Sequence, residues 1–224
     1  MSKMFKTITR TWNPFTGCRF DCYNGGCWAK RLAEGKLTNS YPNGFIPQFH
    51  PERLNTKFKA GDFVFVSSMG DISFADPLEL IEILEVIENN QQAKFLIQTK
   101  NPVLYAGKFN FPPNVYHGCT IETNRPYPKT ISKALAVDLR YAIMASLEVE
   151  HKFLSIEPVM DFDLSEFSTW IYDINPEIVE IGADNYGNHL PEPSWDKVSK
   201  LIEVLTLHGI KVIQKEGLGR LKDD

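Results

Sequence analysis

The sequence has few cysteines, and it has no apolar run long enough to cross a bilayer. Four of its 224 residues are cysteine, and the opening residues, Met-Ser-Lys-Met-Phe-Lys, form no apolar signal stretch. These absences argue against a disulfide-rich secreted protein and against a membrane protein. We therefore expect a soluble cytoplasmic protein, in which thiols stay reduced.

The chain also lacks a strong net charge, which is −4 from 24 basic and 28 acidic residues. The charges are unevenly distributed, because residues 1–60 carry ten Lys or Arg against three acidic residues. That segment has a net charge of +7, and the other residues carry −11. The basic segment favours an anionic substrate or an acidic protein partner, with ordinary solvated surface as the equal alternative.

Three of the four cysteines, Cys18, Cys22 and Cys27, lie within ten residues in a glycine-rich and aromatic stretch. Cysteines of a packed core behave as small apolar residues and have no reason to gather in this way. Thiolates that share a metal centre do gather, and Gly25 and Gly26 let the backbone turn around such a centre. Metal ligation is therefore the favoured interpretation, and a chance loop or one disulfide is the alternative.

The spacing of the cysteines bears on the kind of metal centre. A structural zinc site takes four protein ligands, commonly from paired C-x2-C motifs, and the sequence has no such pair. A [4Fe–4S] cluster held by three thiolates instead leaves one iron open for a substrate or cofactor. The fourth cysteine, Cys119, lies far away in a predicted strand, and we expect it to be a small core residue.

Apolar strand patterns alternate with amphipathic helical patterns along the chain, which shows no repeat or interdomain linker. Such alternation is typical of βαβ units and a parallel sheet. We predict one α/β domain over residues 1–224. Its expected strands are 6–12, 63–67, 94–98, 115–121, 153–156, 178–181 and 210–213, and its expected helices are 28–35, 78–89, 127–147 and 194–207.

Polar residues follow most of these strands at the point where each strand ends. The carboxyl ends of parallel strands form one functional rim, so we expect these side chains to face one cavity together with the cysteines. An ordinary strand-end lysine, a helix cap or a salt bridge is the structural alternative for each of them. The set is Ser68, Asp71, Lys100, Glu122, Glu157 and Lys215.

Several short segments, in an order that spans most of the chain, resemble the radical S-adenosylmethionine (SAM) superfamily. They are most similar to a phage and prokaryotic branch akin to spore photoproduct lyase. That family spaces its cysteines C-x3-C-x2-C, and this chain has C-x3-C-x4-C, with Gly26 before the last cysteine and Trp28 after it. The similar segments are 11–18, 27–30, 49–54, 68–71, 98–102, 120–124, 155–158 and 214–215.

The resemblance implies a partial parallel (β/α) barrel of the TIM-like type, with a [4Fe–4S] cluster on Cys18, Cys22 and Cys27. It implies reductive cleavage of SAM to a 5′-deoxyadenosyl radical, which abstracts hydrogen from a substrate. It also implies an electron donor such as flavodoxin or ferredoxin, and the lyase-like branch points to a nucleic-acid substrate. The SAM contacts that it suggests are Ser68, Asp71, Lys100, Thr120, Glu122 and Asn124.

A non-catalytic alternative remains open at this point. In it, a metal-stabilised module binds nucleic acid through the basic segment and stacks bases on nearby aromatic side chains. Those aromatic residues are Trp12, Phe15, Phe20, Tyr23 and Trp28.

Overall fold

The structure is a computed structural model that describes residues 5–107 and 109–222. It divides the chain into two compact units. The N-terminal unit holds residues 7–117 and 128–134, and the C-terminal unit holds residues 5–6, 118–127 and 135–222. The single domain expected over residues 1–224 stays a prediction.

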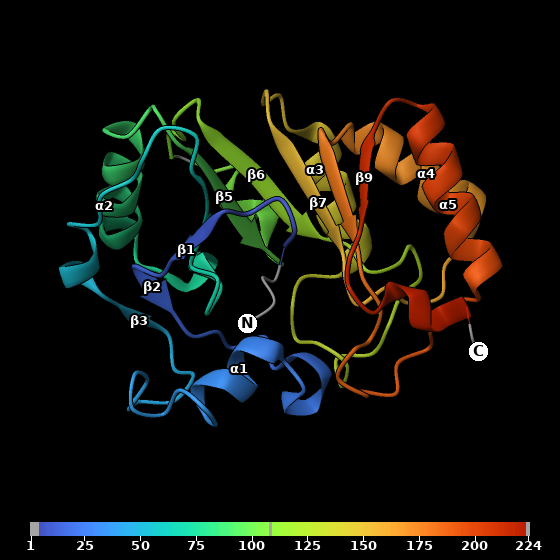
Figure 1. Cartoon of the computed structure of the whole chain (residues 1–224), viewed down its shortest axis with the longest axis horizontal. Coiled ribbons are helices and arrows are strands. Elements are labelled where there is room, and N and C mark those ends of the chain that lie inside the picture. Colours follow the sequence, from blue (N-terminus) through green and yellow to red (C-terminus); the bar gives the residue numbers. More distant parts are fainter. Residues whose placement is uncertain (1–4, 108, 223–224) are drawn as a thin grey trace. The chain divides into compact units, whose positions relative to one another are not determined.

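Seven parallel strands run in the hydrogen-bonded order β1-β4-β5-β6-β7-β8-β9, which is also their order in the chain. Strand β6 (Val115–Thr120) begins in the N-terminal unit and ends in the C-terminal unit. Consecutive parallel strands need crossover connections, and helices supply most of them (Figure 1). The predicted parallel α/β architecture is therefore confirmed.

The N-terminal unit is built on β1 (Arg10–Trp12), β4 (Phe63–Val66) and β5 (Lys94–Thr99), with helix α2 (Pro77–Glu88) between β4 and β5. Pro77 suits the first helical position, and Asp76 with Glu79 forms a capping box before the apolar stripe. That stripe buries Leu80, Ile83, Leu84 and Ile87. The N-terminal unit also contains the 3-10 turns η2 (Pro51–Arg53), η3 (Ile72–Phe74) and η4 (Pro102–Leu104).

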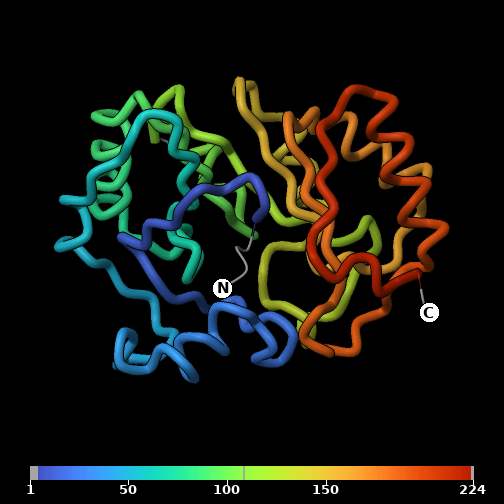
Figure 2. Tube along the Cα trace, in the orientation of Figure 1, coloured from blue at the N-terminus to red at the C-terminus, as the bar shows by residue number. Residues whose placement is uncertain are grey.

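The cysteines lie in an excursion of the chain between two short strands. Strands β2 (Phe15–Thr16) and β3 (Gln48–Phe49) pair in antiparallel register, which brings together the two ends of residues 17–47. The excursion contains the 3-10 turn η1 (Cys22–Gly25) and helix α1 (Trp28–Ala33), and its path is seen in Figure 2. We call residues 16–30 the cysteine loop.

The C-terminal unit contains β7 (Lys152–Ile156), β8 (Ile178–Ile181) and β9 (Lys211–Gln214). Helices α4 (Leu164–Ile174) and α5 (Trp195–Leu207) lie along one side of β8 and β9 in Figure 1. Ser194 accepts a hydrogen bond from the Lys197 N–H and caps α5, as the sequence indicated. Helix α3 (Val137–Ser146) and the 3-10 turn η5 (Leu218–Lys222) complete the unit.

Three elements differ from the sequence prediction. The first strand covers only Arg10–Trp12 of the expected 6–12. The helix expected over 127–147 begins only at Val137, because backbone groups of Ile131 and Lys133 form hydrogen bonds with the cysteine loop instead. Its buried residues are Val137, Arg140 and Met144.

Helix α4 is missing from the prediction altogether, although its sequence carried the signal. Phe167, Trp170, Ile171 and Ile174 are buried and follow the i, i+3, i+4, i+7 spacing of an amphipathic helix.

Two isoleucines of α2 test the packing of the N-terminal unit. Ile83 is 0% exposed and Ile81 is 42% exposed, although both lie in the same helix. Ile83→Ala should lower the free energy of unfolding by about 2–5 kcal/mol, because it removes buried methylene groups and leaves a cavity. Ile81→Ala should change it by no more than about 0.5 kcal/mol. Guanidinium denaturation of the two variants measures the difference, and equal losses would contradict the packing described here.

Candidate functional site

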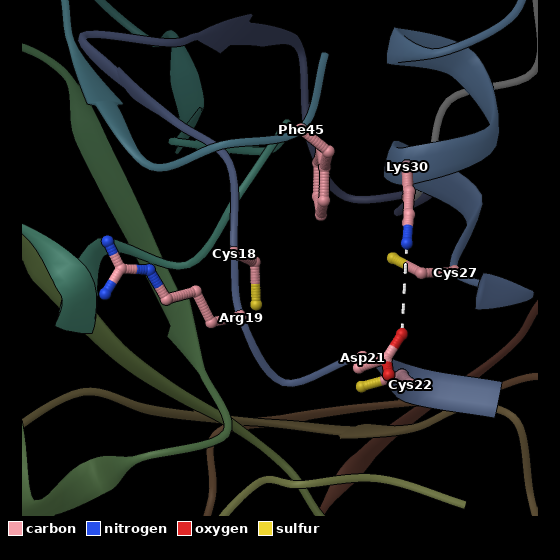
Figure 3. Close-up of a pocket in the computed structure, with 7 residues that line it drawn as sticks. All are labelled: Cys18, Arg19, Asp21, Cys22, Cys27, Lys30 and Phe45. Carbon is pink, nitrogen blue, oxygen red and sulfur yellow. Dashed lines mark ion pairs between the residues drawn. The ribbon is translucent and has the colours of Figure 1, made fainter. Parts of the chain in front are cut away.

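Cys18, Cys22 and Cys27 line one pocket of the N-terminal unit (Figure 3). Its volume is about 260 Å³, and its other lining residues are Arg19, Asp21, Lys30 and Phe45. The three thiols therefore share one cavity, as their spacing in the sequence predicted.

Two glycines fix the start of the cysteine loop against the end of β4. The Gly17 N–H donates to the Met69 carbonyl at 2.9 Å, and the Asp71 N–H donates to the Gly17 carbonyl at 3.1 Å. A Cβ on Gly17 would lie 2.2 Å from the Ile46 carbonyl oxygen, and one on Gly70 would lie 2.5 Å from the Gly17 carbonyl oxygen. Only glycine permits this close approach of two backbones.

The long spacing between Cys22 and Cys27 is accommodated by left-handed backbone. Tyr23, Asn24 and Gly25 have φ values of 58°, 50° and 83°, and Asp21 before them has 49°. Non-glycine residues rarely adopt this region, although Asn and Asp do so more readily than others. The loop therefore turns sharply on itself within one 3-10 turn.

Burial is the main influence on the pKa of two of the three thiols. It raises the pKa of Cys18, and the nearby Asp71 carboxylate raises that pKa further. Burial also raises the pKa of Cys27, against N–H groups of Lys30 and Ala29 that lower it. A metal that binds here must displace the thiol protons, because the thiolate is the metal ligand.

A single metal ion and a multi-iron cluster make different demands on the placement of the thiols. Among residues 5–107 and 109–222, no three His, Cys, Asp or Glu side chains are placed so that they could hold one metal ion. A cluster makes a different demand, because each thiolate binds its own iron and the sulfurs need only surround a cavity. The pocket with its three cysteines fits that demand.

The predicted residues Ser68 and Asp71 form hydrogen bonds at the end of β4. The Ser68 hydroxyl donates to Asn13 Oδ1 at 3.0 Å. Asp71 is buried and accepts from the Ser73 N–H, the Thr99 hydroxyl and the Lys100 N–H. Burial raises the pKa of Asp71, and these donors oppose the rise. Asp71 thus ties the end of β4 to the end of β5.

Lys100 reaches the cysteine loop. Its Nζ donates to the Tyr23 hydroxyl at 2.9 Å and lies 4.8 Å from the centre of the Tyr23 ring. Its positive charge also lowers the pKa of Cys27, although burial acts more strongly in the opposite direction. The structure therefore brings Lys100 near the pocket within the same unit, as the sequence suggested.

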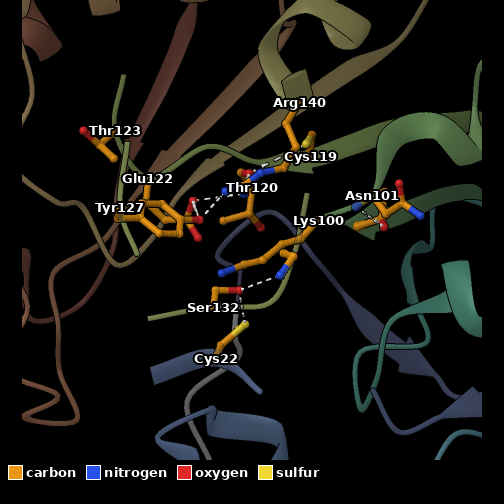
Figure 4. Close-up of polar contacts among 12 residues, drawn as sticks. Cys22, Lys100, Asn101, Cys119, Thr120, Glu122, Thr123, Tyr127, Ser132 and Arg140 are labelled. Carbon is orange, nitrogen blue, oxygen red and sulfur yellow. Dashed lines mark hydrogen bonds and ion pairs between the residues drawn. The ribbon is translucent and has the colours of Figure 1, made fainter. Parts of the chain in front are cut away.

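Thr120 and Glu122 belong to a buried polar network of the C-terminal unit (Figure 4). Arg140 of α3 pairs with the Glu122 carboxylate at 3.0 Å and also donates to the Thr120 carbonyl and the Tyr127 hydroxyl. The Tyr127 hydroxyl donates to Glu122 at 3.3 Å. Burial alone would lower the pKa of Arg140, but the Glu122 carboxylate raises it, so Arg140 keeps its charge. This salt bridge is the structural alternative that the sequence left open for Glu122.

Asn124 has different partners in the same unit. Its Oδ1 accepts from the Asp163 N–H at 2.9 Å and its Nδ2 donates to Glu166 at 2.7 Å. The Asn124 side chain therefore binds both the N-cap and the first turn of α4. Glu157 and Lys215, the other strand-end residues, pair with each other. Cys119 is 0% exposed, and its predicted burial is confirmed.

Sequence reasoning missed several residues of these networks. Asn13 accepts from both Ser68 and the Met69 N–H, Ser132 contacts Cys22, and Arg140 anchors Glu122. Asn13 and Ser132 carry no distinctive motif. Arg140 lies on the buried face of α3, where a charge needs a partner, but no motif in the sequence marks that face.

The fold resembles those of radical SAM enzymes. A spore photoproduct lyase mutant with bound AdoMet and dinucleoside spore photoproduct matches with a TM-score of 0.55 and 13% identity. The match covers 87% of this chain and 59% of that one. SuiB of Streptococcus suis, bound to the precursor peptide SuiA, matches with a TM-score of 0.53 and 11% identity, over 93% of this chain and 49% of that one. The chain thus spans about half to three fifths of the length of these proteins.

These likenesses establish the predicted fold class, a partial parallel (β/α) barrel of the radical SAM type. The chain belongs to the family described as "Protein of unknown function (DUF5131)", whose model matches residues 4–175. A comparison with curated protein sequences finds no match. In the part of the chain that the structure describes, no helix is both long and apolar enough to cross a membrane.

The Glu122–Arg140 pair leads to a stability prediction. Arg140→Met should cost about 3–5 kcal/mol of unfolding free energy, because it leaves the Glu122 carboxylate buried without its counter-ion. Arg125 is a matched control, since it also pairs with carboxylates, Asp161 and Asp163, but its side chain is 42% exposed. Arg125→Met should have a small effect, because water screens exposed pairs. Chemical denaturation compares the two, and an equal loss would show that burial does not decide the contribution of the pair.

Proposed function

We propose that this chain is a radical SAM enzyme that holds one [4Fe–4S] cluster on Cys18, Cys22 and Cys27. One observation carries the proposal: the three thiols line a single pocket in a fold that matches radical SAM enzymes. The cluster, when bound, supplies the electron that breaks a carbon–sulfur bond of SAM and so starts radical chemistry. The protein's contribution is to hold, orient and shield the reactants.

The pocket residues support distinct roles in this proposal. The three cysteines, as thiolates, ligate iron. Phe45 lines the pocket and is buried, so it limits the access of water to the metal centre. Arg19 and Lys30 place positive charge at the same pocket, and Lys133 is exposed close to it through its ion pair with Asp21. This charge suits an acidic electron donor such as flavodoxin or ferredoxin.

We propose Lys100 and Ser68 as direct contacts of SAM. An ammonium such as that of Lys100 suits the SAM carboxylate, and a hydroxyl such as that of Ser68 suits either end of the amino-acid group. The Asp71 carboxylate accepts a hydrogen bond from the backbone N–H of Lys100, so the proposed role of Asp71 is to position Lys100.

Thr120, Glu122 and Asn124 are the further SAM contacts that the resemblance implies, and we keep them as proposals. Glu122 is already neutralised by Arg140, so it suits the ribose hydroxyls of SAM better than a cationic group. Asn124 holds the start of α4 and thereby the backbone around Thr123, whose hydroxyl donates to the Asp161 carbonyl.

The substrate proposed here is a nucleic acid or a nucleobase-containing molecule, on the strength of the lyase-like motifs. The SuiB structure holds a peptide, so a peptide is the alternative substrate class. Of the aromatic side chains named for the stacking alternative, Trp12, Phe15 and Phe20 are buried in the N-terminal unit, whereas Tyr23 and Trp28 are half-buried.

Anaerobic reconstitution with iron and sulfide tests the cluster. We expect about four irons per chain and the spectrum of a [4Fe–4S] centre in the wild type. Cys18→Ala, Cys22→Ala and Cys27→Ala should each lose most of the iron, because each removes one ligand. Cys119→Ala is the control, and it should retain the full cluster since Cys119 is buried outside the pocket lining. Stoichiometric zinc without iron uptake would contradict the proposal.

The Lys100 assignment is tested by SAM binding to the reconstituted protein. Lys100→Met should weaken binding by about 10–100-fold, the range expected for the loss of one charge-assisted hydrogen bond. Lys94 is a matched control at the other end of β5, because its Nζ likewise donates to a tyrosine, Tyr116, at 3.1 Å. Lys94→Met should leave SAM binding unchanged in isothermal titration. Equal effects of the two substitutions would remove Lys100 from the site.

A further inference from the structure

Residues 128–134 form a clasp on the cysteine loop, within the N-terminal unit. The Tyr23 N–H donates to the Ile131 carbonyl at 2.6 Å, and the Lys133 N–H donates to the Phe20 carbonyl at 2.7 Å. The Lys133 ammonium also donates to Asp21 at 2.9 Å. Two main-chain hydrogen bonds and one ion pair therefore join segments that lie more than a hundred residues apart in the sequence.

Ser132, at the centre of the clasp, touches a proposed cluster ligand. Its hydroxyl oxygen lies 3.2 Å from the Cys22 sulfur, and both residues are buried (Figure 4). The same oxygen accepts a hydrogen bond from the Ala134 N–H at 3.2 Å. That bond occupies one acceptor position of the hydroxyl and leaves the hydroxyl proton available for Cys22.

The direction of the bond between Ser132 and Cys22 follows from ligation. A thiol and a hydroxyl can each donate to the other, but a metal-bound cysteine is a thiolate and can only accept. In the loaded protein, Ser132 must therefore be the donor in this contact. Hydrogen bonds to cluster sulfurs stabilise the additional negative charge of the reduced state and raise the reduction potential.

We infer that Ser132 is a positioning residue for the cluster, which holds the Cys22 thiolate through an O–H···S hydrogen bond and raises the reduction potential of the metal centre. The inference rests on the proposed function and assigns to it a residue outside the cysteine loop. The other two sulfurs have backbone donors, from Phe20 to Cys18 and from the first turn of α1 to Cys27. The donor to Cys22 is a side chain, so substitution can remove it.

The experiment uses the full chain, reconstituted anaerobically, as wild type, Ser132→Ala, Ser132→Thr and Ser168→Ala. Iron and sulfide content is measured first, and the midpoint potential is then obtained from a redox titration followed by EPR. Ser168 is the matched control, because its buried hydroxyl donates to the Leu164 carbonyl within α4, in the C-terminal unit. We expect the midpoint of Ser132→Ala to shift to a more negative potential. Ser132→Thr, which keeps a hydroxyl, and Ser168→Ala should stay at the wild-type value.

Each outcome bears on a different claim. A complete cluster in Ser132→Ala with an unchanged midpoint overturns the inference and leaves the proposed function intact. A wild-type chain that takes up no iron contradicts the proposed function and the inference with it. If Ser132→Ala alone assembles no cluster, Ser132→Val replaces it, because valine has the shape of the threonine variant without its hydroxyl. A midpoint of Ser132→Val equal to that of Ser132→Thr then overturns the inference.

Discussion

The close contact between the backbone at Gly17 and the end of β4 is the constraint on which the cysteine site depends. Two hydrogen bonds across this contact fix where the cysteine loop leaves the sheet. Two residues of the proposed site adjoin this contact. Cys18, a proposed metal ligand, follows Gly17 in the chain, and Asp71 donates its N–H to the Gly17 carbonyl. Asp71 passes the constraint on to β5, because it accepts the Lys100 N–H. A small rigid contact thereby sets the positions of a metal ligand and a proposed SAM contact together.

Much of the architecture could be predicted from the sequence, because apolar periodicity and helix caps are local signals. Strands β4, β5, β7 and β8 lie where alternation and apolar runs indicated, and Ser194 caps α5 as expected. The helix before β7 was predicted too long because residues 131 and 133 form backbone hydrogen bonds with the distant cysteine loop, which no local signal records. The gathering of three cysteines was likewise a local signal, and the pocket they line agrees with it.

The rest depends on contacts between distant parts of the chain, which no local pattern records. The sequence does not reveal that Ser132 meets Cys22 or that Lys100 meets Tyr23. It also does not reveal that Tyr23 and Asn24 adopt positive φ, because a left-handed tyrosine is held by its surroundings and not by its own preference. Glu122 is an example. Its charge at the end of a strand suggested a ligand contact, and the structure shows in addition that it pairs with the buried Arg140.

The pairing of β2 with β3 holds the two ends of residues 17–47 together, so the length of this segment is not fixed by the distance between its ends. Because Phe15 and Phe49 pair in register, residues 17–47 begin and end at nearly the same place, on a two-stranded sheet separate from the seven-stranded one. The cost of closing such a loop grows only with the logarithm of its length, so two added residues cost well under about 0.5 kcal/mol. The length of residues 17–47 can therefore change at little entropic cost while β2 and β3 keep their register.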